Sequence, residues 1–136
     1  MTLPPDMECI EEAQLLIWRP RGVLDEALVE TAISFVTETE NELGKSFSRF
    51  TDLSLIDRVD LRFQFVFQVA LSRRLSRRGR SPLKSAFFVT NPAIAHYFHM
   101  AAVLTDHSPL KVALFETREA AAKWLGVAPE LLAPKE

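Results

Sequence analysis

This sequence contains one cysteine, four glycines and no apolar run long enough to cross a bilayer. A single cysteine, Cys9, cannot close an internal disulfide, which suits a reducing compartment. So few glycines, with no low-complexity tract, argue against a disordered or repetitive chain. Membrane spans need roughly 18 consecutive apolar residues. The first residues also lack the basic and apolar regions of a secretory signal, so we expect a cytoplasmic protein.

Sequence motifs that are typical of catalytic sites are absent as well. There is no Gly-x-Ser-x-Gly elbow, glycine-rich phosphate loop, dinucleotide fingerprint or His-Glu-x-x-His word. Asp57 and Asp60 could serve as an acid/base pair, but carboxylates near a helix start also have a purely stabilising role. We therefore expect a protein that is not an enzyme and that has no cofactor.

Three histidines are the remaining candidates for metal chemistry. His96 and His99 are spaced to share one helix face, and Asp106 and His107 follow in the next predicted loop. No cysteine pair supports a zinc site, and polar tips on a mostly apolar helix explain the same residues. The sequence therefore predicts no metal site.

Positive charge is concentrated in one short segment. The net charge of the 136-residue chain is −2, yet residues 72–80 contain five arginines and no acid, so the remainder sums to −7. A chain that is acidic elsewhere is not expected to bind nucleic acid. Cations stabilise a helix C-terminus, and they also bind anionic headgroups. The candidate contacts with an anionic membrane surface are Arg73, Arg74, Arg77 and Arg78.

Periodicity, the helix-capping residues Asp25 and Thr117 and the helix-ending glycines Gly44 and Gly126 predict alternating strands and helices. Strands are expected near 7–10, 13–18, 47–56, 83–90 and 110–115, and helices over 25–43, 61–78, 93–104 and 117–126. Residues 59–71 are apolar at every second position, which is typical of a strand. The cationic end and Gly79 that follow favour a helix, so we predict a helix there.

The helix predicted over 93–104 carries more apolar residues than one buried face requires. Of its twelve positions only His96 and His99 are plainly polar. The surplus would enter a deeper core or meet a ligand, a second subunit or lipid. We take Tyr97, Phe98 and Met100 as the candidate ligand-binding residues.

Four segments resemble the SpoIIAA-like family of small α/β proteins, also described as STAS/SEC14-like. They are FTDLS at 50–54, LKSAFFV at 83–89, SPLKVALF at 108–115 and EAAAKWLG at 119–126. The resemblance implies one α/β domain over 1–136, with a four- to five-stranded, mainly parallel mixed sheet and four helices in the order β-β-α-β-α-β-α-β-α. It also implies an apolar ligand cleft with membrane association, or regulation through protein contacts.

The regulatory proteins of the STAS group act through a phosphorylatable serine in an Asp-Ser-Ser-Gly motif at the start of a helix. The matching positions here are 56–61, where Arg58 and Val59 replace the serines and Asp60 replaces the glycine. We therefore predict a non-catalytic domain that binds an apolar, lipid-like ligand or a membrane surface. The alternative is a STAS-like regulator without the switch serine, acting on a protein partner or as a homodimer.

Overall fold

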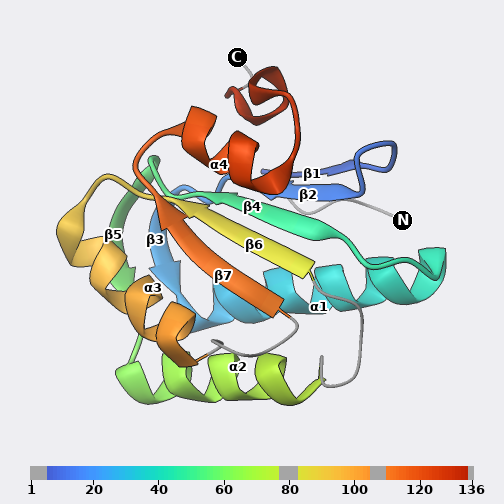
Figure 1. Ribbon diagram of the computed structural model, residues 1–136. Helices are drawn as coiled ribbons and strands as arrows, with labels where there is room; N and C mark the ends of the chain where they lie inside the picture. The colour runs from blue at the N-terminus through green and yellow to red at the C-terminus, as the bar shows by residue number, and fades with distance from the viewer. Residues whose placement is uncertain (1–5, 77–82, 105–109, 135–136) are drawn as a thin grey trace.

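The computed structural model describes residues 6–76, 83–104 and 110–134, in which a five-stranded sheet is the central layer (Figure 1). The strand order is β1-β2-β4-β6-β7. Strand β1 pairs antiparallel with β2, and every other neighbouring pair is parallel. The five strands are β1 (Met7–Ile10), β2 (Leu15–Trp18), β4 (Ser48–Asp52), β6 (Leu83–Phe88) and β7 (Leu110–Phe115). The mixed, mainly parallel sheet with four helices is confirmed.

Each face of the sheet packs against its own set of helices, because neighbouring residues of a strand point to opposite sides. One face carries Leu15, Ile17 and Phe50, which pack with Ala121 and Ala122 of α4 (Arg118–Leu125). We call this the α4 face. The opposite, three-helix face is covered by α1 (Glu26–Leu43), α2 (Phe63–Ser76) and α3 (Pro92–Leu104) (Figure 1).

Helix ends lie where the capping residues predict them. The Asp25 carboxylate accepts a hydrogen bond from the Leu28 amide at 2.8 Å, and α1 ends at Gly44, whose φ of 62° is left-handed. Thr117 caps α4 by accepting from the Ala120 amide at 3.1 Å. These bonds satisfy backbone donors that have no partner inside the helix.

Residues 63–76 form α2, so the helical interpretation of this ambiguous segment is confirmed. The helix buries Phe65, Val66 and Ala70 but leaves Phe63 and Phe67 exposed. Apolar residues therefore occur on both sides of α2. Their alternation along the sequence does not mark the buried and exposed faces of a strand.

A second, two-stranded parallel sheet was not expected. It consists of β3 (Gly22–Asp25) and β5 (Ile56–Asp60). The single strand predicted over 47–56 is therefore wrong: β4 ends at Asp52, and the chain turns before β5 begins in the other sheet. The Asp52 carboxylate stabilises that turn by accepting from the Ser54 amide at 2.9 Å.

Strand β5 also corrects the comparison with the phosphorylation motif. Positions 56–60 are extended and paired with β3, whereas α2 begins only at Phe63. These positions are therefore not a helix start. Between the strand and the helix, Arg62 forms a two-pronged ion pair with Glu26 of α1, with both N–O distances 2.8 Å. This pair joins the N-terminal ends of α1 and α2.

Candidate functional site: an apolar cavity under the sheet

A cavity of about 170 Å³ lies between the three-helix face of the sheet and helices α1, α2 and α3. All three helices and all five strands of the main sheet contribute to its wall, which is mostly apolar. The helix residues in the wall are Val29, Ala32, Ile33, Val36, Phe65, Val66, Val69, Ala70, Phe98 and Ala101. The apolar strand side chains that face the cavity are Met7, Leu16, Trp18, Leu24, Phe87, Leu110 and Val112. A wall of this composition suits an apolar occupant.

Three polar side chains interrupt this wall at the centre of the sheet. Arg49 and Thr51 belong to β4, and Ser85 belongs to β6, where it stands in register with Arg49. They are 7%, 7% and 6% exposed, respectively. We call these residues the polar trio. Two central strands thus place hydroxyl and guanidinium groups where a packed core normally has aliphatic side chains.

The charge of Arg49 is balanced by Glu40 near the end of α1. One guanidinium nitrogen of Arg49 donates to Glu40 Oε1 at 3.2 Å, and Glu40 Oε2 accepts from the Phe47 amide at 2.8 Å. Both side chains of the ion pair are largely buried. A buried ion pair persists when further hydrogen bonds satisfy its oxygens, and the Phe47 amide supplies one.

The three predicted ligand-binding residues of α3 lie in different surroundings. Phe98 lines the cavity and packs on Phe87, with ring centroids 4.8 Å apart. Tyr97 stacks on Phe63 of α2 at 5.0 Å. Met100 is half-buried and is not part of the cavity wall. The structure therefore brings Phe98 to the cavity, whereas Tyr97 packs between α3 and α2.

An exposed apolar stripe runs along α2, whereas α3 exposes the single large apolar side chain of Val103 among its described residues. Phe63, Phe67 and Leu71 are 47%, 46% and 42% exposed and follow one another at four-residue intervals. We call them the α2 stripe. The helix was predicted here, but its exposed apolar residues were not distinguished from its buried ones. Their helical spacing is the signal that could have found it.

The predicted arginine contacts follow this stripe in sequence. Arg73 and Arg74 belong to the last turn of α2, and Arg77 and Arg78 lie outside the residues that the structure describes. None of the described helices is both long and apolar enough to span a membrane.

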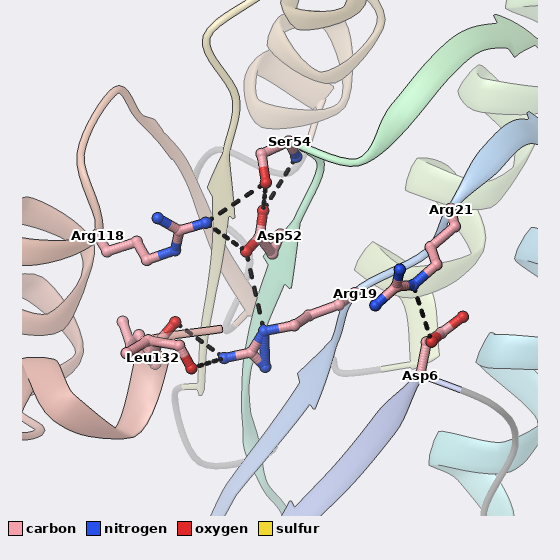
Figure 2. A network of polar contacts seen from close by, with 8 residues as sticks. Asp6, Arg19, Arg21, Asp52, Ser54, Arg118 and Leu132 are labelled. Atoms are coloured by element: carbon pink, nitrogen blue, oxygen red, sulfur yellow. Dashed lines mark hydrogen bonds and ion pairs between the residues drawn. The ribbon is translucent and has the colours of Figure 1, made fainter. Parts of the chain in front are cut away.

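A polar network closes the carboxyl end of β4 (Figure 2). Asp52, the last residue of that strand, is only 1% exposed. Its Oδ2 accepts from Arg118 at 3.0 Å and lies 3.9 Å from Arg19 Nε, while its Oδ1 accepts from the Ser54 hydroxyl at 2.6 Å. We call Arg19, Asp52, Ser54 and Arg118 the carboxyl-end network. It joins β2, β4 and the first turn of α4.

Arg19 extends this network to the C-terminal segment. One of its nitrogens donates to the carbonyl oxygens of Leu132 and Ala133, each at 2.8 Å. Burial lowers the pKa of Arg19, and the nearby Asp52 carboxylate opposes that shift. Ligands of open parallel sheets commonly bind beyond the carboxyl ends of the strands. Here α4 and the segment after it cover that edge, so the network holds the fold together.

Other candidate groups are not assembled for chemistry. Burial raises the pKa of the Cys9 thiol, and Glu11 and Glu12 raise it further, so the nucleophilic thiolate is disfavoured. Within residues 6–76, 83–104 and 110–134, no three His, Cys, Asp or Glu side chains are grouped to hold a metal ion. His107 and Asp106 fall outside those ranges.

Comparison with known proteins identifies the fold. An uncharacterised DUF3478-family protein from Shewanella loihica PV-4, described as having a SpoIIAA-like fold, superposes with a TM-score of 0.50. The match covers 82% of this chain and 83% of that one, at 16% sequence identity. No protein-family model and no curated protein matches the sequence. The chain has a SpoIIAA-like fold, in agreement with the resemblance of its sequence.

Proposed function

Starting from the SpoIIAA-like fold, we propose that this protein is a non-catalytic binding protein that holds a small apolar molecule in its cavity. The cavity itself is the observation that supports this proposal. At about 170 Å³ it exceeds the roughly 150 Å³ that suffices to hold benzene in an apolar protein interior. A single ring with a short substituent fits this size.

The energetic cost of an empty cavity supports the same proposal. In enclosed apolar cavities, unfilled volume destabilises a protein by about 24 cal/mol for each Å³, so the upper bound for 170 Å³ is about 4 kcal/mol. This is a large share of the ~5–15 kcal/mol by which a typical domain is stable. An apolar occupant would recover part of that free energy.

A cavity-filling substitution tests whether this space is available. Ala70 lines the cavity from α2, so Ala70→Leu is expected to raise the free energy of unfolding by about 1 kcal/mol and to weaken ligand binding. The matched control is Ala122→Leu in the core of the α4 face, where overpacking should cost about 1–3 kcal/mol. Urea unfolding measures the free energy of unfolding of both variants. Equal destabilisation by the two substitutions would show that the cavity is closed in solution.

Contact with an anionic membrane is the second candidate function, and the α2 stripe favours it. Two phenylalanines and a leucine on one exposed helix face can enter the boundary between headgroups and acyl chains. The arginines of residues 72–80 come next in the sequence and carry the charge that such a surface attracts. A protein partner would cover the same stripe, and vesicle binding distinguishes the two.

A further inference from the structure

We infer that the cavity selects a small apolar molecule that carries one uncharged hydrogen-bond acceptor, a carbonyl or hydroxyl oxygen. This inference rests on the proposed function and specifies its ligand. It comes from the polar trio and from Glu40. The remaining wall would take any apolar body of suitable size.

The polar trio places donors at one position in the wall. Arg49 and Ser85 are directly opposite each other on neighbouring parallel strands, and Thr51 is the next residue of β4 on the same face. All three are more than nine-tenths buried. A ligand oxygen that reaches the centre of the sheet would therefore meet guanidinium and hydroxyl donors away from bulk water, where hydrogen bonds are strongest.

Glu40 makes the cavity select an uncharged ligand over an anionic one. Its carboxylate already neutralises Arg49 across 3.2 Å, in a pair that is largely buried. A ligand carboxylate would bring a second anion close to Glu40 in a medium of low dielectric constant, where like charges repel strongly. A neutral oxygen accepts from the same donors and leaves the charge balanced. The geometry therefore favours a ketone, ester, amide or alcohol over an acid.

Three ligands of similar size test this selection: acetophenone, ethylbenzene and benzoate. We expect acetophenone to bind about tenfold more tightly than ethylbenzene, because a hydrogen bond to a charged donor is worth about that factor. Benzoate should bind at least about tenfold more weakly than acetophenone. Dissociation constants come from NMR titration at pH 7. Equal binding of acetophenone and ethylbenzene, or tightest binding of benzoate, would overturn the inference. Binding of none would instead refute the proposed function.

Substitutions in the wall assign the selection to these residues. Ser85→Ala and Thr51→Val should each reduce the preference for acetophenone over ethylbenzene, because each removes a hydroxyl donor from the wall. Thr37→Val is the matched control, because this hydroxyl bonds to the Ile33 carbonyl on the exposed side of α1. An unchanged preference in both wall variants would overturn the assignment.

Glu40→Gln provides the sharper test. The amide oxygen can still accept from the Phe47 amide, but the charge of Arg49 loses this carboxylate. We expect the preference to shift toward benzoate by at least about tenfold. If the variant binds benzoate no better, relative to acetophenone, than the unaltered protein does, Glu40 does not set the ligand charge. If it fails to fold, Ser85→Ala still decides whether the trio recognises the ligand.

Discussion

Arg118 and Asp52 are 66 positions apart in the sequence, yet a nitrogen of one lies 3.0 Å from a carboxylate oxygen of the other. The bond joins the first residue of α4 to the last residue of β4. Arg118 also lies over the ring of Phe88, 4.4 Å from its centroid. One side chain therefore connects the carboxyl ends of two neighbouring strands to the helix that covers them.

Removing the charge of Asp52 should cost far more than removing that of an exposed partner. In Asp52→Asn, Arg19 and Arg118 lose their shared, buried carboxylate, and we expect the free energy of unfolding to fall by about 3 kcal/mol. Asp6→Asn is the control, since its pair with Arg21 is exposed and should be worth less than about 1 kcal/mol. Urea unfolding compares them. Similar losses in the two variants would contradict a stabilising role for the network.

The pair of Glu26 with Arg62 should make stability depend on acid. Hydrogen bonds from Arg62 lower the pKa of Glu26 in the folded protein. Because the folded pKa is the lower one, the unfolded chain binds the proton first, and this stabilisation is present above the unfolded pKa of about 4.3. It disappears as the pH falls through the folded pKa.

Glu26→Gln checks this assignment. Thermal unfolding from pH 7 to pH 2 should show the variant melting lower than the unaltered protein at pH 7, with the difference closing in acid. Glu30 is a neighbouring acid of α1, and Glu30→Gln is the control. The difference in melting temperature between this control and the unaltered protein should not close in acid as that of Glu26→Gln does. A difference that persists unchanged at pH 2 would mean that the charge of Glu26 is not the cause.

The α2 stripe is expected to contact anionic vesicles. Phe67→Asp places a charge in the stripe and should abolish co-sedimentation with phosphatidylserine-containing vesicles. Leu55→Asp is matched to it, because Leu55 is similarly exposed, at 40%, in the turn between β4 and β5. This control should still sediment. Loss of vesicle binding in both variants would argue against the membrane proposal. Absence of binding by the unaltered protein would argue against it as well.

The arginines of residues 72–80 should make that binding depend on salt. Replacing Arg73, Arg74, Arg77 and Arg78 with glutamine removes about 1 kcal/mol of attraction for each charge near an anionic surface. Raising the salt concentration should similarly weaken vesicle binding by the unaltered protein, because exposed charges are screened beyond about 10 Å at 0.1 M. Binding that is insensitive to salt would exclude these arginines from the membrane contact.

Cys9 should react slowly with thiol reagents. Burial and the neighbouring Glu11 and Glu12 raise its pKa, so less thiolate is present at pH 8 than in the unfolded chain. Alkylation by iodoacetamide should therefore be slower in the native protein than in urea and should speed up as the pH rises. Native and unfolded rates that coincide would show that the thiol is neither shielded nor electrostatically suppressed.

The sequence predicted what local chemistry determines. Asp25 and Thr117 cap the helices whose starts they indicated, and Gly44 and Gly126 end them. Strand β5 escaped prediction because three of the five residues of Ile56–Asp60 are charged and only Ile56 is buried, and its pairing with β3 is a long-range contact. Local patterns do not contain that information.

The candidate site was predicted only in part, for a similar reason. Phe98 was chosen because the helix over 93–104 has surplus apolar residues, but a cavity depends on how far helices stand from a sheet. Arg49 and Ser85 were visible as polar residues inside predicted strands, yet only the register of β4 with β6 shows that they are adjacent. Polar residues in the middle of predicted buried strands are therefore the sequence signal for polar groups in a cavity wall.

The bonds from Arg19 to the backbone of Leu132 and Ala133 also affect the order in which the molecule can be completed. A ribosome delivers residue 19 long before residue 132, so these two bonds can form only after residues 132 and 133 have been added. Because Arg19 binds carbonyl oxygens, the identity of the side chains at 132 and 133 matters little to these bonds, whereas the presence of the backbone there is essential. A chain stopped before residue 132 is expected to lack both bonds and to leave Arg19 exposed to water on this side.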